Sequence, residues 1–160
     1  MGAHLRSPIL SVFLTYYKSI INMHKEYKGT CKCGNVDILV NLPLELSAYS
    51  PRTCNCDYCK KRELTVISDV CGSIKVTSRI PLRIERQGSN QADFRNCSKC
   101  GDFIIVSYSY SDCCKGAVNA ALLSSIAAFK RPTPISTKLL SSSKKLQRWK
   151  TVWSEVSYYE

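Results

Sequence analysis

Seven of the ten cysteines in this 160-residue chain lie in three tight clusters, and this arrangement constrains the fold more than any other sequence feature. A chain of this length can bury a core large enough to fold without disulfides. The clusters are GTCKCG, with Cys31 and Cys33; CNCDYC, with Cys54, Cys56 and Cys59; and NCSKCG, with Cys97 and Cys100. Thiols at such short spacing are typical of metal ligands. We therefore expect a fold built around bound metal.

The number of thiols in each cluster predicts two kinds of site. Structural zinc is usually closed by four nitrogen or sulfur ligands, whereas catalytic zinc commonly has three protein ligands and one open position. The clusters supply two, three and two thiols. The simplest partition joins the first and third clusters in a closed four-thiolate site and leaves the middle cluster as a three-thiolate site with an open position. On this partition the chain holds two Zn²⁺ ions, and the second is available for chemistry.

Other partitions remain open from the residues alone. The middle cluster can recruit Cys71, Cys113 or Cys114 as a fourth ligand, which would make both sites structural. The only two histidines are His4 and His24, so cysteine is the expected ligand type. An iron-sulfur cluster also takes four thiolates, but the C-x-C spacing does not match the ferredoxin motifs. A disulfide network would require an N-terminal secretory signal.

Short runs of β-branched and aromatic residues separate the cysteine clusters and predict a mainly β fold. Glycine, proline, serine and asparagine lie between these runs, as expected for turns. The expected strands are VDILVNL (36–42), ELTVIS (63–68), SIKVTS (73–78), LRIER (82–86) and DFIIVSYSYS (102–111). The alanine-rich segment 117–130 has no clear apolar stripe, so we assign it no element.

The C-terminal region predicts one short amphipathic helix. The prolines of RPTPISTK interrupt any regular element before it, because proline cannot continue a helix or a central strand. Leu146, Trp149, Trp153 and Val156 then recur at helical spacing. Such a stripe is typical of a helix that docks on a core.

We expect one domain with two flanking segments. Residues 1–22 form an N-terminal extension that is disordered or absent from the mature protein, and its apolar stretch SPILSVFLTYY is too short to span a membrane. Residues 23–130 form the zinc-binding domain, and residues 131–160 form a basic, serine-rich segment with the docked helix. Free thiols indicate a reducing, cytoplasmic location. A mitochondrial location is the alternative, because residues 1–25 carry basic residues without acids.

The cysteine motifs resemble those of the glutathione-dependent formaldehyde-activating enzyme and centromere protein V family. The matching motifs are G-x-C-x-C-G, C-x-C-x-x-C and C-x-x-C-G, and the resemblance covers about residues 26 to 115. It implies a fold of several small coiled β-sheets around two zinc ions. The structural ion is implied at Cys31, Cys33, Cys97 and Cys100, and the catalytic ion at Cys54, Cys56 and Cys59. The chain departs from the usual triplet C-x-C-S-x-C, because Asp57 stands in the serine position.

The resemblance also implies carbon-sulfur lyase activity. The family joins formaldehyde and glutathione to give S-(hydroxymethyl)glutathione, so the expected partners are a small thiol such as glutathione and an aldehyde. Three thiolates leave a bound zinc with net negative charge, which favours binding of the thiol sulfur over polarisation of the carbonyl. Candidates to bind carboxylates flank the triplet: Arg52, Lys60, Lys61 and Arg62. Asp57 is a candidate proton acceptor or a turn-capping residue.

The alternative function is a zinc-stabilised binding module. The formal net charge is +11, which favours anionic partners. Residues 130–150 contain basic residues and no acid: Lys130, Arg131, Lys138, Lys144, Lys145, Arg148 and Lys150. With Trp149 and Trp153 close by, this segment can bind nucleic acid or an acidic protein surface with salt-dependent affinity. The other interpretation is a solubilising surface on a docked helix.

Overall fold

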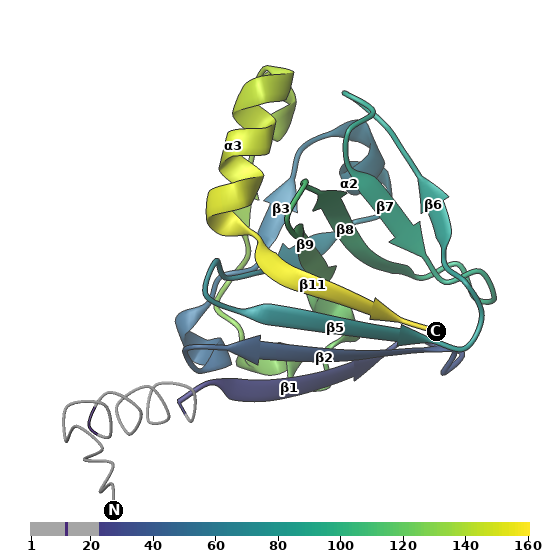
Figure 1. Cartoon of the computed structure of the whole chain (residues 1–160), viewed down its shortest axis with the longest axis vertical. Helices are drawn as coiled ribbons and strands as arrows, with labels where there is room; N and C mark the ends of the chain where they lie inside the picture. Colours follow the sequence, from purple (N-terminus) through teal and green to yellow (C-terminus); the bar gives the residue numbers. More distant parts are fainter. Residues whose placement is uncertain (1–11, 13–22) are drawn as a thin grey trace, which may run out of the picture.

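The strands of the computed structural model join into one mixed, branched sheet, which confirms the mainly β class (Figure 1). The structure describes residues 23–160 together with Val12, so the predictions for the other N-terminal residues lie outside the described part. The strands are β1 (Lys25–Thr30), β2 (Val36–Leu42), β3 (Arg52–Cys54), β4 (Thr65–Ile67), β5 (Ser73–Ser78), β6 (Arg83–Glu85), β7 (Asp93–Asn96), β8 (Phe103–Ser109), β9 (Cys114–Asn119), β10 (Thr133–Ile135) and β11 (Ser154–Tyr159). The main path runs β1-β2-β5-β11-β9-β4-β3-β10, and β8, β7 and β6 continue from β9 as a second arm.

Short helices lie at the margins of the sheet. The α-helices are α2 (Asp57–Lys61) and α3 (Ser142–Val152), and the 3-10 turns are η1 (Leu46–Ala48), η2 (Ala120–Leu122), η3 (Ile126–Ala128) and η4 (Thr137–Leu139). Helix α3 rises above the start of β11 at one side of the molecule (Figure 1). Among the described residues, no helix has the length and apolar character needed to cross a membrane.

Strand β9 is the point at which the sheet branches. One of its edges pairs with β8 along its length. The opposite edge pairs first with β11, where Gly116 lies opposite Ser154, and then with β4, where Val118 lies opposite Ile67. A Cβ atom on Gly116 would lie 2.7 Å from the carbonyl oxygen of Val106, so the junction requires glycine.

All five strands predicted from the sequence are present, because β2, β4, β5, β6 and β8 lie within the predicted segments. The other strands carry charged, glycine or proline residues and depend on pairing with distant segments, so their local sequences gave little signal. Strand β10 contains Pro134 and, within the described residues, pairs only with β3 at the end of the path, which is where a strand tolerates proline.

The predicted C-terminal helix is correct at its start and wrong at its end. Helix α3 begins after the N-cap residue Ser141, contains Trp149 and ends at Val152. Val156 lies instead in β11, where SEVSYY alternates between buried and exposed side chains. The pairing of β11 with β5 on one side and β9 on the other overrides the helical spacing. The segment 131–160 therefore contributes β10 and the central strand β11 to the same sheet as residues 23–130, and helix α3 lies between these two strands in the chain.

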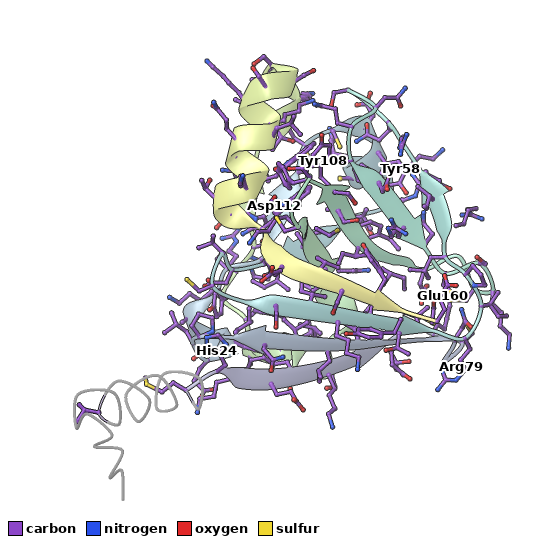
Figure 2. The ribbon with its side chains drawn as sticks, in the orientation of Figure 1. His24, Tyr58, Arg79, Tyr108, Asp112 and Glu160 are labelled. Atoms are coloured by element: carbon purple, nitrogen blue, oxygen red, sulfur yellow. The ribbon has the colours of Figure 1, made fainter. Side chains whose placement is uncertain are left out.

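Two hydrophobic clusters fill the fold. The first lies along β2, β5 and β8 and includes Cys31 and Cys97. The second, which we call the second core, lies between α3 and strands β7 to β9. Its buried members are Leu64, Ala92, Phe94, Phe103, Val106, Ala117, Trp149 and Trp153. The two tryptophan rings stack with centroids 4.7 Å apart, and Tyr108 lies beside α3 with its ring 5.9 Å from Trp149 (Figure 2).

Candidate metal centres and the adjoining cavity

The first and third cysteine clusters come together at two neighbouring turns. Cys31 and Cys33 lie in the turn between β1 and β2, whereas Cys97 and Cys100 lie in the turn between β7 and β8. Their four Sγ atoms lie within 4.8 Å of one another and can hold a metal ion. We call this group the four-cysteine site. The structure thus brings together the four thiols that the sequence analysis paired.

The sulfur-sulfur distances fit a tetrahedral metal site. The Sγ atom of Cys31 lies 3.6 Å from that of Cys33 and 3.8 Å from that of Cys97, and the Sγ atoms of Cys33 and Cys97 are 3.6 Å apart. A disulfide would need about 2.0 Å. Four sulfurs at about 2.3 Å from a central Zn²⁺ would lie about 3.8 Å from one another. The spacing therefore suits zinc and other ions that prefer tetrahedral thiolate ligands.

Nitrogen donors around the four-cysteine site favour the thiolate form of Cys97. The Asn35 side chain donates a hydrogen bond of 3.6 Å to the Cys97 sulfur. Burial raises the pKa of Cys97, but the backbone N–H groups of Cys100 and Lys99, together with Asn35, outweigh burial and lower this pKa to about 6. Thiolates are the metal-binding form of cysteine, so this environment favours a bound cation.

The middle cluster lies where β3 ends and α2 begins. Cys54 is the last residue of β3, Cys56 is the N-cap of α2, and Cys59 lies inside that helix. Cys56 and Cys59 lie on the same face of the helix, because residues three positions apart are neighbours on a helix surface. The three Sγ atoms lie within 4.8 Å of one another and can also hold a metal ion. We call this group the three-cysteine site.

Polar groups from distant segments contact the three-cysteine site. The Thr137 hydroxyl oxygen lies 3.4 Å from the Cys54 sulfur, and the Gln87 amide nitrogen lies 3.7 Å from the Cys56 sulfur. A hydrogen bond from the Cys59 thiol is the main cause that lowers the pKa of Cys54 to about 4, with Thr137 adding to this effect and burial opposing it. The same hydrogen bond raises the pKa of Cys59. The environment therefore favours the thiolate form of Cys54, which suits a bound cation.

The other cysteines lie outside both sites. Cys71 is exposed in the turn before β5, and Cys113 and Cys114 lie where β8 leads into β9. His24 is exposed and belongs to neither site, while His4 lies outside the described residues. Within residues 23–160, the three-cysteine site therefore has no fourth cysteine, histidine or acidic ligand. All ten cysteines are free thiols, so the structure contains no disulfide network.

The three-cysteine site opens onto a cavity of about 110 Å³. Helix α3, strand β8 and the loop between β6 and β7 contribute to its lining. Most of the second core forms its apolar wall: Ala92, Phe94, Phe103, Val106, Trp149 and Trp153. A neighbouring, more open hollow shares Ile135, Thr137 and Arg148 with the cavity.

Among the residues that the structure describes, four basic residues and no acidic residue line the cavity, and we call these four the basic rim. They are Arg52, Lys138, Lys145 and Arg148. No ion pair in the described part of the chain involves any of them. Burial lowers the pKa of Arg52 to about 10, and the charge of Arg148 adds to this effect, so Arg52 still carries its proton at neutral pH. The positive charge of the basic rim, which no carboxylate in the described part of the chain pairs with, favours an anionic ligand.

Only Arg52, of the four residues predicted to bind carboxylates, lines the cavity. Lys60 and Lys61 are exposed at the end of α2, and Arg62 instead forms an ion pair with β6. Asp57 is exposed in the first turn of α2 and does not line the cavity either. The reason is local, because α2 points its cysteines toward the cavity and its charged residues toward solvent.

The other polar residues of the cavity do not stand out in the sequence as site residues. Lys138, Lys145 and Arg148 were predicted only as members of a basic segment, and Gln87 and Thr137 were not singled out. They are distant from the cysteines in sequence and belong to no motif. The one available signal was the excess of basic over acidic residues in the C-terminal segment.

The fold and the site define a mainly β protein with two cysteine clusters that can each hold a metal ion. No family model and no curated protein matches the chain. Among solved structures, the crystal structure of a Rhodobacter sphaeroides protein, a Northeast Structural Genomics target, matches with a TM-score of 0.51 and 25% identity. The match covers 66% of this chain and 97% of that chain. The cysteine clusters are compatible with the zinc-binding fold of the family that the motifs resemble.

Proposed function

We propose that this protein is a metal-dependent carbon-sulfur lyase that forms and cleaves a thiol-aldehyde adduct, like S-(hydroxymethyl)glutathione synthase. One observation carries the proposal. Three cysteine sulfurs lie within 4.8 Å of one another at a cavity lined by four basic and no acidic residues. Three ligands from the chain leave one coordination position for an external sulfur, as in catalytic rather than structural zinc sites.

The basic rim supplies the binding site for the thiol substrate. A thiol that carries carboxylates, as glutathione does, matches its uncompensated positive charge. Arg148 and Thr137 line both the cavity and the open hollow, so a peptide-sized thiol can extend from the cysteines into that hollow. In the proposed complex, the substrate sulfur binds at the three-cysteine site and its carboxylates bind among the arginines and lysines.

The reaction is an addition without a redox step. The C–S bond forms as the carbonyl π bond opens, and the proton of the thiol passes to the aldehyde oxygen. A zinc ion at the three-cysteine site would keep the substrate sulfur ionised at neutral pH. Thr137 and Gln87 contact two of the cysteine sulfurs and orient them. The apolar wall limits access of water to the adduct.

Exchange spectroscopy by NMR tests the proposal, because it measures the rate at which glutathione and formaldehyde interconvert with their adduct at equilibrium. We expect the zinc-loaded protein to increase this rate above that of buffer. Cys54→Ser should return the rate to the buffer value, whereas Cys71→Ser, which changes an exposed cysteine outside both sites, should not. A wild-type rate equal to that of buffer would refute lyase activity with these substrates.

A second comparison tests the role of the basic rim. Arg148→Gln removes a positive charge from the cavity lining, whereas Arg131→Gln removes one from an exposed position outside it. We expect Arg148→Gln to raise KM for glutathione about tenfold, as expected for loss of one charged hydrogen bond, and to leave KM for an uncharged thiol unchanged. An equal effect on both thiols would contradict carboxylate binding by this residue.

A binding module remains the second candidate, and the exposed part of α3 supports it. Lys144 and Lys150 are exposed and take part in no ion pair within the described residues. If this surface binds a polyanion such as nucleic acid, Lys144→Glu with Lys150→Glu should weaken binding at low salt by on the order of tenfold. Unchanged affinity in that double variant would remove this candidate.

A further inference from the structure

We infer that the aldehyde half of the substrate carries an apolar group of several carbon atoms, which the wall of the cavity binds. The inference rests on the proposed lyase function and names the substrate class of the same site. It departs from formaldehyde, whose single carbon atom needs no apolar binding surface.

The first observation is that the second core forms one wall of the cavity. Six of its eight buried residues line the cavity beside the three cysteines. Phe103 is 4% exposed, Trp153 is 6% exposed and Trp149 is 7% exposed, so the wall is buried rather than part of an open surface. Protein cores normally leave few voids larger than a water molecule. A core that surrounds a cavity next to reactive sulfurs is suited to receive a ligand.

The second observation is the size and chemistry of this space. The cavity measures about 110 Å³, whereas about 10–15 Å³ on the same measure is enough to hold one water molecule. Formaldehyde has only two non-hydrogen atoms and would leave most of the space empty. The apolar wall of the cavity favours an apolar group, because water finds few hydrogen-bond partners along the buried side chains of the second core. A branched alkyl group or a small ring fits both the volume and the lining.

The third observation is that the polar and apolar parts of the lining suit different ligands. The open hollow that shares Thr137 and Arg148 with the cavity suits the charged thiol. The second core contributes only apolar side chains, and it therefore suits the hydrocarbon part of R–CHO. The reaction R–CHO + R′–SH gives R–CH(OH)–SR′, with the thiol proton on the former carbonyl oxygen and no other reactant.

Tryptophan fluorescence gives a direct test of binding, because the chain has two tryptophans and both line the cavity. The probe is 3-methylbutan-1-ol, which has the hydrocarbon group of 3-methylbutanal but no reactive carbonyl. We expect a saturable change in emission with the metal-loaded wild type. Val66→Phe fills part of the cavity, so the dissociation constant should rise at least tenfold. Val70→Phe makes the same change at an exposed position outside the cavity and should bind like wild type.

The activity test compares 3-methylbutanal with formaldehyde, each with glutathione and each relative to its uncatalysed rate. One buried methylene contributes about fourfold, so four extra carbon atoms predict an acceleration greater by on the order of a hundredfold. Val66→Phe should remove this advantage. Ala92→Leu fills the cavity from the β6–β7 loop and provides a second variant if Val66→Phe does not fold.

Three outcomes distinguish the two proposals. A greater acceleration with 3-methylbutanal, lost in the cavity-filling variants, supports both proposals. Acceleration with formaldehyde alone overturns the inference and retains the lyase function. Acceleration with neither aldehyde overturns the lyase function and the inference with it.

Discussion

Removal of metal should destabilise this protein mainly through the four-cysteine site. That site joins residues far apart in the chain, since Cys31 and Cys97 are 66 positions apart and their sulfurs lie 3.8 Å apart. The three-cysteine site joins Cys54 to Cys59, which are near neighbours in the chain. An unfolded chain can therefore gather the three local thiols around a metal ion more easily than the four distant ones.

The difference follows from the entropy of loop closure. Closing a loop of 66 residues costs about 4 kcal/mol, whereas closing a loop of five residues costs about 2 kcal/mol. The folded protein has already closed both loops, so it binds each metal more tightly than the unfolded chain by about these amounts. Metal that binds the folded state preferentially stabilises it, and binding to the unfolded chain reduces this effect. We expect about 4 kcal/mol from the four-cysteine site and about 2 kcal/mol from the three-cysteine site.

Urea denaturation with and without a chelator measures these two quantities under reducing conditions. Cys54→Ser with Cys59→Ser leaves only the four-cysteine site, so its free energy of unfolding should fall by about 4 kcal/mol on chelation. Cys97→Ser with Cys100→Ser leaves only the three-cysteine site, and its free energy of unfolding should fall by about 2 kcal/mol. Cys71→Ser is the control and should respond like wild type. Equal losses in the two double variants, or a larger loss in the second, would refute the reasoning.

Three further predictions concern the framework of the cavity. Gly116→Ala should lower the free energy of unfolding by about 1 to 3 kcal/mol in urea denaturation, because its Cβ would lie 2.7 Å from the Val106 oxygen and 2.9 Å from a methyl carbon of Val156; a neutral result would contradict the close packing at β9. Ser141→Ala should cost about 1 kcal/mol in thermal unfolding, because Ser141 caps α3; Ser141→Asp should preserve the cap. Burial raises the pKa of Tyr158 to about 12, against an ordinary value of 10.0, so the protonated form favours the folded state. The free energy of unfolding should then decrease between about pH 10 and pH 12, and an unchanged decrease in Tyr158→Phe would show that another group causes it.

The cysteine clusters were predictable from the sequence because the geometry within each cluster is local. C-x-C and C-x-x-C spacing places thiols on one turn independently of the rest of the fold. The number of thiols in each cluster then limited the ways in which the seven cysteines could be divided between two sites. The strands were predictable for the same reason where β-branched residues alternate, as in Val36–Leu42. The second glycine of G-x-C-x-C-G, Gly34, also has a local role. Its φ of 74° in the turn between β1 and β2 is a backbone conformation that favours glycine.

The cavity was not predictable, because distant segments assemble it. Lys60 and Lys61 are close to the cysteines in sequence but face solvent, whereas Lys145 and Arg148 are distant in sequence but line the cavity. The central position of β11 likewise depends on its partners. The apolar residues Trp149, Trp153 and Val156 continue the helical spacing beyond the end of α3. Only the pairing with β5 and β9 makes residues 154–159 a strand rather than a further part of the helix.

The place of β11 in the sheet has a consequence for the order in which the protein can fold during synthesis. β11 follows every other described strand in the chain, yet it lies between β5 and β9 (Figure 1). Until residues 154–159 leave the ribosome, β5 and β9 each present an open edge that can pair with another chain. The ligands of the four-cysteine site all precede residue 101, so metal binding can hold the β1-β2 and β7-β8 hairpins together during this interval. Free zinc during translation should therefore reduce aggregation of the nascent protein, whereas zinc added after release should have less effect.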